Sequence, residues 1–375
     1  MEGLVAAELS ALGVTVTATE PGGCSATGSL LDVARLNMQL RTASRILVRR
    51  AQFSARALGE LERKAGLLPW KEWLPPTLPV VLRVSCKKSR LYHQRAVAER
   101  IGNAIRGSTG LESTTSAGDI ESDGDADPEG EAPHQLVVVR FYRDECTISV
   151  DSSGELLHRR GWRLATAKAP LRETLAAALL AASGWDPVTP LLDPFCGSGT
   201  IPIEAALQAR RILPNLERRF AVERWPGFDA ATLTALRVAA RAETLPVAPA
   251  MILGADRDAG AIAAARANAV RAGVAADIEW REAAVSALDP PQGRVGNVVT
   301  NPPYGLRIGD ARDLRNLFAR LGTVARERLA GWQITLLLGD TPLERATGLA
   351  FRSVLTTRNG GLHVRLLSGR VPESP

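Results

Sequence analysis

The most constraining feature of this 375-residue chain is the run Asp193 to Thr200, in which an acid precedes a glycine-rich turn. The apolar pair Leu191-Leu192 leads into it and a helix-like stretch, residues 201–210, follows, so the order is strand, tight loop, helix. In an open α/β sheet, ligands bind outside the carboxyl ends of the strands. Gly197 and Gly199 leave the backbone accessible there, and exposed N–H groups bind polar ligands. The run therefore predicts the floor of a ligand site.

A second motif follows further along the chain, where the apolar stretch Val298-Val299-Thr300 leads into Asn301-Pro302-Pro303-Tyr304. Between the two motifs, the apolar stretch 251–255 ends in Asp256. The two motifs and the intervening acid, in this order, resemble the class I S-adenosylmethionine (SAM) methyltransferases that modify exocyclic or amide nitrogens. The resemblance implies SAM as the cofactor and an α/β fold, a Rossmann-like doubly wound sheet over residues 171–371.

The resemblance also implies which residues bind the cofactor and which react. Asp256, at the end of a strand, suits the ribose hydroxyls, and Asp193 would orient the loop or meet the methionine amine. Asn301 and the Pro302 carbonyl would accept hydrogen bonds from the target amine, while Tyr304 stacks on a flipped-out base. The predicted catalytic residues are Asn301, Pro302, Pro303 and Tyr304. The predicted cofactor-binding residues are Asp193, Pro194, Phe195, Cys196, Gly197, Gly199, Thr200, Glu204, Asp256, Arg257 and Ala284.

One position departs from the family pattern. Many class I enzymes carry an acid after the third strand that binds the adenine amine, whereas this chain has Arg281-Glu282-Ala283-Ala284-Val285-Ser286 there. Glu282, Ser286 or the backbone near Ala284 are the open alternatives for that contact.

The N-terminal part predicts two modules ahead of the methyltransferase domain. Residues 1–75 form a small α+β unit of ferredoxin-like type, and the abrupt helical start is what a chain lacking the first strand of that unit would show. Residues 76–151 resemble the THUMP domain, an RNA-binding module of several RNA-modifying enzymes. Residues 107–133, rich in Gly, Ser, Thr, Asp and Glu, predict a disordered acidic insertion within that module.

A basic linker, residues 152–170, joins these modules to the methyltransferase domain. Its His158-Arg159-Arg160-Gly161-Trp162-Arg163 and the following Lys168 to Ala177 resemble the enzymes that couple a THUMP module to a guanine-N2 methyltransferase. Lys and Arg attract phosphates and aromatic rings stack on bases; a solvated basic surface is the plainer alternative. The predicted RNA-binding residues are Lys87, Lys88, Arg90, Tyr92, His158, Arg159, Arg160, Arg163 and Arg307.

Charge and composition support a polyanionic partner and exclude other classes. The net charge is +6, but residues 112–131 hold eight acids and no Lys or Arg, so the remainder carries +14. No apolar run approaches the length of a membrane span, and the start lacks the pattern of a signal peptide. The four scattered cysteines indicate neither a disulfide framework nor a zinc site. We expect a cytoplasmic, monomeric protein without metal.

The resulting hypothesis is a SAM-dependent RNA guanine-N2 methyltransferase acting on 23S rRNA, with tRNA as the alternative substrate. Methylation of DNA adenine or of a protein glutamine could use the same tetrapeptide, although the basic module argues against both. A non-catalytic RNA-binding protein is the alternative from a different class. The intact Asn301 to Tyr304 motif speaks against it, and the absent acid near Ala284 speaks for it.

Overall fold

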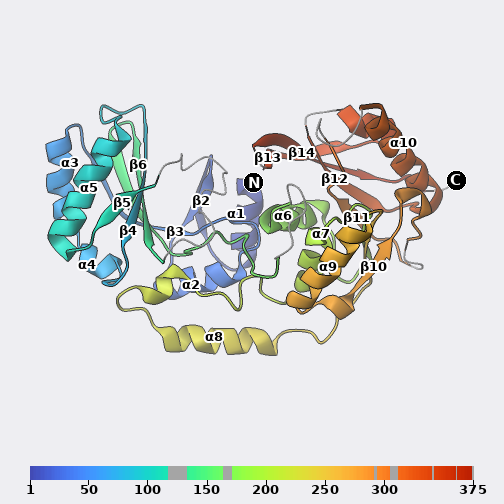
Figure 1. Ribbon diagram of the computed structural model, residues 1–375, viewed down its shortest axis with the longest axis horizontal. Coiled ribbons are helices and arrows are strands. Elements are labelled where there is room, and N and C mark those ends of the chain that lie inside the picture. Colours follow the sequence, from blue (N-terminus) through green and yellow to red (C-terminus); the bar gives the residue numbers. More distant parts are fainter. Residues whose placement is uncertain are drawn as a thin grey trace.

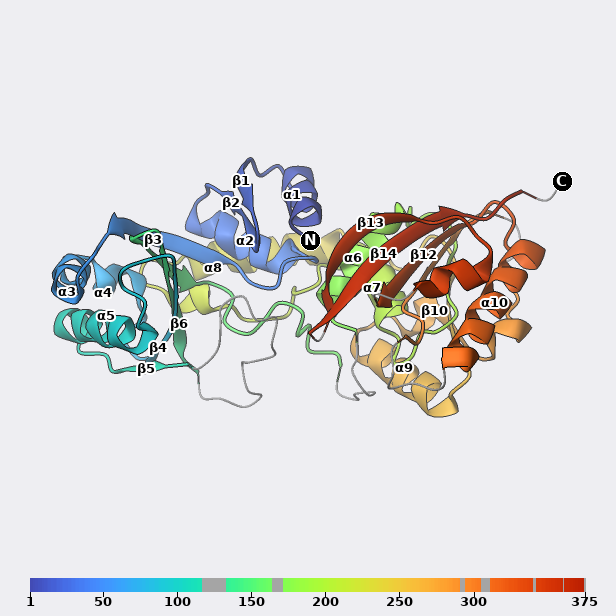
Figure 2. The same cartoon turned by 90° about the horizontal axis from the view of Figure 1, so that it is seen from above.

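The computed structural model describes residues 1–116, 133–163, 171–290, 294–304, 311–339, 342–359 and 361–373. The molecule is elongated (Figures 1 and 2), with a five-stranded sheet at one end and a seven-stranded sheet at the other. A small unit with a two-stranded sheet lies between them on one side. Three bodies are therefore visible along the long axis, and the N-terminal unit lies between the other two.

The small unit is built from the first four elements of the chain, α1 (Glu2–Ala11), β1 (Val16–Glu20), β2 (Gly23–Ala26) and α2 (Leu30–Gln39). Helix α2 begins at a capping box, because the Ser29 side chain accepts from the Asp32 N–H and the Asp32 carboxylate accepts from the Ser29 N–H. Strands β1 and β2 pair antiparallel. A short α+β unit at the N-terminus was predicted, and the structure has one.

The next unit is a mixed sheet of five strands in the order β3-β7-β6-β4-β5. Strand β4 is parallel to both β5 and β6, while β7 is antiparallel to β6 and β3. Its elements are β3 (Leu47–Ser54), α3 (Leu58–Gly66), α4 (Trp70–Trp73), β4 (Val80–Lys87), α5 (Gln94–Thr109), β5 (Ser113–Thr115), β6 (Gln135–Tyr142) and β7 (Glu145–Asp151).

Two predicted boundaries in this region differ from the structure. Residues 47–75 were assigned to the first unit, but β3 pairs with β7 along its whole length and so belongs to the five-stranded sheet. The acidic insertion was predicted to begin at residue 107, yet α5 continues to Thr109, ends at a left-handed Gly110, and is followed by β5. Residues 117–132, the rest of that prediction except Pro133, lie outside the described residues.

The C-terminal body is a seven-stranded sheet in the order β10-β9-β8-β11-β12-β14-β13. The first five strands run parallel, and β14 is antiparallel to its neighbours β12 and β13. The doubly wound α/β fold is thereby confirmed. Its main elements are α6 (Glu173–Ser183), β8 (Leu191–Asp193), α7 (Thr200–Ala209), β9 (Ile252–Asp256), α9 (Ala259–Arg271), β10 (Ile278–Glu282), β11 (Asn297–Thr300), α10 (Ala311–Arg328), β12 (Gln333–Gly339), β13 (Arg352–Asn359) and β14 (Leu362–Arg370).

The segment between α7 and β9 leaves the C-terminal body and packs on the N-terminal half. It contains a 3₁₀ helix, η1 (Ala221–Arg224), and α8 (Ala230–Ala242), which runs along the lower side of the molecule in Figure 1. Trp225 is 3% exposed within the core of the N-terminal half and donates its indole N–H to Gln135 at 2.8 Å. The sequence patterns predicted neither α8 nor this packing.

A buried ion pair also joins the halves. Arg160 of the linker lies 3.3 Å from the carboxylate of Glu204 on α7, and neither side chain is exposed. Arg160 also donates to the backbone carbonyl of Arg41, whose own guanidinium lies 3.8 Å from Glu204. One carboxylate thus meets cations from the N-terminal unit and from the linker, at a point where burial makes an unpaired charge costly.

Glu204→Ala should destabilise the chain by about 3–5 kcal/mol, because it leaves two buried guanidinium groups without their counter-charge. The matched control is Glu279→Ala, which breaks the exposed pair with Arg281 and should cost under about 1 kcal/mol. Urea unfolding followed by far-UV circular dichroism measures both. Equal losses for the two variants would show that the buried pair has no special role.

Candidate functional site

Three strands of the C-terminal sheet end side by side and bring the predicted site residues to one edge. Strands β9, β8 and β11 are parallel neighbours, so their carboxyl ends coincide. Asp256 is the last residue of β9, Asp193 is the last of β8, and Asn301 directly follows β11. The two sequence motifs and the intervening acid are therefore adjacent in space, where ligands bind in this fold.

The glycine loop is held against the end of β9 by two backbone contacts. The Cys196 N–H donates to the Ala255 carbonyl at 2.9 Å, and the Gly197 N–H donates to the Asp256 carboxylate at 3.0 Å. Both glycines have left-handed backbones, with φ of +51° at Gly197 and +86° at Gly199. A Cβ at Gly199 would lie 2.7 Å from the Trp280 ring, whereas one at Gly197 would meet nothing within 4 Å. Gly199 is required by packing, and Gly197 faces open space.

Asp193 is buried, and its carboxylate is the centre of the loop. It accepts from the Thr300 hydroxyl at 2.5 Å and from the Phe195 N–H at 3.2 Å. Burial raises the pKa of Asp193 to about 7, with a further increase from Asp256, while the two hydrogen bonds oppose that rise. Asp193 thus ties the glycine loop to the strand that carries Asn301.

The Asn-Pro-Pro-Tyr segment places one unpartnered acceptor at this edge. Asn301 Oδ1 is buried and accepts no hydrogen bond from any described residue. Pro302 is buried, while Pro303 and Tyr304 are half-buried. A buried amide oxygen without a donor costs free energy, so such an atom points to a missing ligand.

Tyr304 is fixed at both ends of its ring. Its hydroxyl accepts a hydrogen bond from Asn359 Nδ2 at 3.2 Å. Its ring packs closely against Gly339, because a Cβ added at that glycine would lie only 3.0 Å from the ring atom Cδ2. Burial raises the pKa of the Tyr304 phenol above its ordinary value. The hydroxyl is thereby engaged in positioning.

The remaining predicted cofactor residues surround the loop with different exposure. Pro194, Cys196 and Thr200 are buried and Phe195 is half-buried, whereas Arg257 and Ala284 are exposed. The Ala283 N–H donates to the Asp256 carbonyl at 2.9 Å, which places the turn after β10 beside the acid. Glu282, one alternative for the adenine contact, is exposed at the end of β10.

Two predicted site residues are corrected by the structure. Glu204 was predicted to bind the cofactor and Arg160 to bind RNA, but they are paired with each other in the buried contact described above. A guanidinium with no exposed surface cannot meet a phosphate, and a fully buried carboxylate that faces two arginines inside the protein is not accessible to a cofactor.

Other linker residues also turn inward rather than toward solvent. Arg163 donates to the Thr200 hydroxyl at 2.8 Å and lies 3.3 Å from the Glu173 carboxylate. Burial raises the pKa of Glu173 to about 7, and the positive charge of Arg163 opposes that rise. His158 is buried and Arg159 is half-buried. Arg163 therefore supports the start of α7, and the prediction of an RNA-facing linker is not supported at His158 or Arg163.

The other predicted RNA-binding residues lie far from the glycine loop along the chain. Lys87, Lys88, Arg90 and Tyr92 are exposed at and after the end of β4, in the N-terminal half. Arg307 lies outside the described residues.

Three residues of the site were not singled out from the sequence. They are Thr300, which donates to Asp193; Trp280, which covers Gly199; and Asn359, which holds Tyr304. Thr300 could have been found as a hydroxyl residue next to the motif at a strand end. Trp280 and Asn359 approach only through tertiary packing and carry no local signal.

The site fits SAM on these observations. The open space at Gly197 leaves room for a ligand against the loop backbone, and Asp256 stands half-exposed beside it with an acceptor carboxylate. Asp256 would hold the ribose, the glycine loop would underlie the methionine portion, and the unpartnered Asn301 oxygen would face the reacting groups.

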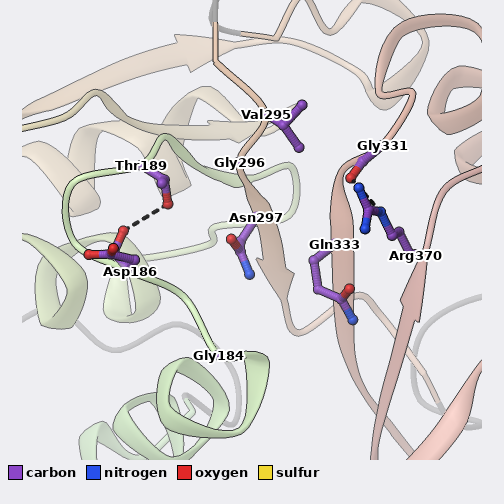
Figure 3. A pocket seen from close by; sticks show the side chains of 9 residues that line it. All are labelled: Gly184, Asp186, Thr189, Val295, Gly296, Asn297, Gly331, Gln333 and Arg370. Carbon is purple, nitrogen blue, oxygen red and sulfur yellow. Dashed lines mark hydrogen bonds between the residues drawn. The ribbon is translucent and has the colours of Figure 1, made fainter. Parts of the chain in front are cut away.

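The described residues also line a surface depression that is unrelated to this site. It has a volume of about 260 Å³ and lies at the amino ends of the parallel strands, opposite the edge with Asn301 (Figure 3). Asn297, Gln333 and Arg370 line it. Over the same described ranges, no group of three or more His, Cys, Asp or Glu side chains is placed to hold a metal ion. No helix there is long and apolar enough to cross a bilayer.

The strand order, the glycine loop between β8 and α7 and the acid ending β9 define a class I SAM-dependent methyltransferase. Residues 160–366 match the family model of the RMKL-like methyltransferase domain, and residues 1–47 match that of the RlmL ferredoxin-like domain. The chain belongs to the RMKL-like methyltransferase family, and its N-terminal unit is ferredoxin-like as predicted.

Individual relatives are similar over the full length of the chain. The chain is 32% identical over 98% of its length to "Putative RNA methyltransferase slr0064" of Synechocystis sp., of which it covers 93%. It is 35% identical over its whole length to the ribosomal RNA large subunit methyltransferase K/L of Syntrophotalea carbinolica, but spans only 52% of that protein. The solved structure of SMU.472 in complex with SAH superposes with a TM-score of 0.84 at 27% identity, covering 100% of this chain and 95% of that one. This agrees with SAM as the cofactor.

The two loop glycines should respond differently to alanine. Gly199→Ala should lower stability, because the new methyl group meets Trp280 and the backbone is left-handed. Gly197→Ala carries only the backbone cost, about 1 kcal/mol, but places a methyl group where the cofactor approaches. Thermal melts and SAM calorimetry separate the two. A Gly197→Ala variant with parental SAM affinity would exclude the cofactor from that space.

The raised pKa of Asp193 predicts a pH-dependent contribution to stability. Between its ordinary value of 3.8 and about 7, the folded chain keeps a proton that the unfolded chain has released. Folding is therefore favoured at the low end of this window, and that advantage is lost as pH rises through it. The Asp193→Asn variant lacks this titration. The parent's free energy of unfolding, relative to that of the variant, should therefore decrease between about pH 4 and 7 and stay constant above that range. A difference that stays flat in urea titrations would refute the raised pKa.

Proposed function

We propose that the chain transfers a methyl group from SAM to the exocyclic N2 of a guanine in 23S rRNA. The Asn301 oxygen carries the proposal, because it is a buried acceptor with no described donor at the edge where the cofactor fits. The similarity to the large-subunit rRNA enzyme supports this choice of RNA, although the chain spans about half of that relative.

The guanine amine is a weak nucleophile because its lone pair is delocalised into the ring. Asn301 Oδ1 and the Pro302 carbonyl would each accept one amine proton, so that the lone pair turns toward the methyl donor. Bound SAM supplies an electrophilic methyl group on a sulfonium centre. As the N–C bond forms and the S–C bond breaks, positive charge grows on the nitrogen, and the two acceptors stabilise it. One amine proton then passes through these acceptors to water.

Tyr304 would provide the surface for the flipped base. Because Asn359 and Gly339 fix its ring, the surface is preorganised before RNA arrives. The two prolines limit backbone freedom in the same loop. The chain's own residues thus orient the target base and the hydrogen-bond acceptors, and the proposed reaction uses no strong base.

The N-terminal half would supply affinity for RNA. We propose that the five-stranded unit, which begins at β3, acts as the THUMP-like module predicted for residues 76–151, with Lys87, Lys88 and Arg90 exposed for phosphate contacts. These cations belong to a chain whose charge outside the acidic tract is strongly positive.

Asn301→Ala should lower the single-turnover methyl-transfer rate about 10²–10³-fold while SAM and RNA affinities change little, since the lost contact strengthens only in the transition state. Asn301→Asp keeps an acceptor and should retain more activity than alanine. Tyr304→Phe should be mild and Tyr304→Ala severe, because stacking needs the ring.

The assay supplies radiolabelled SAM with protein-free 23S rRNA, tRNA or duplex DNA in separate reactions, and mass spectrometry identifies the methylated nucleoside. N2-methylguanosine in 23S rRNA alone is the expected product. Label in tRNA or on adenine would contradict the proposed substrate. An Asn301→Ala variant that reacts at the parental rate would remove this loop from the chemistry.

A further inference from the structure

An exposed aromatic ring lies close to two cations where strand β6 of the five-stranded sheet ends. Tyr142 ends β6, and its side chain is 48% exposed. The Arg143 guanidinium lies 5.3 Å from the ring centroid and the Lys88 ammonium lies 5.8 Å from it. Lys87 is the register partner of Tyr142 on β4, so the neighbouring strand carries a third cation at this position. We refer to Tyr142, Arg143, Lys87 and Lys88 as the Tyr142 platform.

Two of these cations occupy backbone positions that disfavour them. Lys88 has φ of +51°, and Arg143 and Asp144 have φ of +52° and +64° in the two-residue turn between β6 and β7. Such turns favour Asn-Gly or Asp-Gly, because both central residues need positive φ. Departures of this kind from local preference are more frequent at functional sites.

The surrounding contacts hold the two turns in one arrangement. Asp144 accepts from the Arg90 N–H at 2.8 Å, and the Asp144 N–H donates to the Ser89 hydroxyl at 3.0 Å. Ser89 in turn donates to the Lys87 carbonyl at 3.0 Å. The turn after β4 and the β6–β7 turn are therefore braced together, and the cations are set beside the ring before any ligand binds.

The charge and exposure of the Tyr142 platform suit a polyanion with an accessible aromatic face. The Asp144 carboxylate is paired with Arg56 at 3.3 Å, so its negative charge is compensated. Glu145, the cross-strand partner of Tyr142, is then one acid beside several cations, and the local charge is positive. A second exposed aromatic, Tyr92, lies against His93 with ring centroids 4.0 Å apart on the same connection after β4. Duplex RNA buries its base faces, whereas an unpaired nucleotide offers both a base face and a phosphate.

We propose that the Tyr142 platform binds an unpaired nucleotide of the RNA substrate, with the base stacked on Tyr142 and the flanking phosphates on Lys88 and Arg143. This inference rests on the proposed RNA function and adds to it a preference for single-stranded RNA at a surface remote from Asn301. Tyr142 and Arg143 are assigned from the structure, since neither was singled out in the sequence.

Fluorescence anisotropy with the full chain tests the platform, with a labelled 12-nucleotide unstructured RNA and a 12-base-pair RNA duplex as probes. Tyr142→Ala should weaken single-strand binding by roughly 5- to 150-fold, the range that one stacked base supplies, and duplex binding by less than about twofold. Tyr142→Phe, which keeps the ring, should bind within about twofold of the parent.

The double variant Lys88→Asn/Arg143→Asn tests the cations without disturbing the turns. Asn is favoured at positive φ, so the melting temperature should hold or rise while the log–log salt slope for the single strand falls by about 1.4. The matched control, Arg315→Gln/Arg320→Gln, removes two exposed cations from α10 and should leave the slope unchanged.

The outcomes separate this inference from the proposed function. RNA binding that is unaffected by Tyr142→Ala, or reduced equally for single strand and duplex, overturns the platform and leaves the methyltransferase proposal standing. A parent chain that binds SAM but neither RNA probe overturns both. Selective loss of the single strand in Tyr142→Ala, with parental SAM affinity and an unchanged melt, supports the platform.

Discussion

The buried pairing of Arg160 with Glu204 fixes how the two halves of the molecule meet. Glu204 lies on α7, the helix that begins at the glycine loop, while Arg160 lies in the linker and bonds to the backbone of the N-terminal unit. The segment after α7 adds a second tie, in which Trp225 enters the core of the N-terminal half. Buried ion pairs contribute little net stability but are costly to break, so they specify one arrangement against others. These two ties set the position of the N-terminal half relative to α7 and the glycine loop.

Local sequence patterns were sufficient to predict which residues meet at one edge of the C-terminal sheet. Asp193, Asp256 and Asn301 each follow an apolar stretch, and in a parallel sheet the ends of neighbouring strands must coincide. The glycines between Asp193 and Thr200 mark a turn that other residues cannot make, and the structure gives both Gly197 and Gly199 positive φ. These features depend on strand direction and backbone sterics, which are local properties, so one sequence reveals them.

The errors came from contacts between residues distant in the chain. Strand β3 reads as part of the first unit until its pairing with β7 is known. From the sequence alone, Arg160 is expected to be a basic surface residue. Its burial depends on Glu204 and on the backbone carbonyl of Arg41, which only the fold brings to it. The hydroxyl of Thr300 and the amide of Asn359 act only once a fold brings Asp193 and Tyr304 to them. Charge and hydropathy indicate whether a side chain favours the surface or the interior. A charged side chain can nevertheless be buried where the fold supplies an oppositely charged or hydrogen-bonding partner.

The electrostatics of the edge that carries Asn301 suit the proposed separation of RNA binding from methyl transfer. Asp256, Asp258 and Glu282 stand half-exposed or exposed there, with Arg257 as an adjacent cation. Carboxylates suit the ribose and the positive charge that develops on a methylated amine, but they repel an RNA backbone. Affinity for a polyanion must then come from elsewhere, and under the proposed function the exposed cations at the end of β4 and in the β6–β7 turn would supply it at the other end of the molecule. A substrate held at one end reaches Asn301 at the other only if the distance between them is constant. The buried Arg160–Glu204 contact provides that constancy, because a mobile junction would spread the target base over many positions and forfeit the preorganisation of the Asn301 loop.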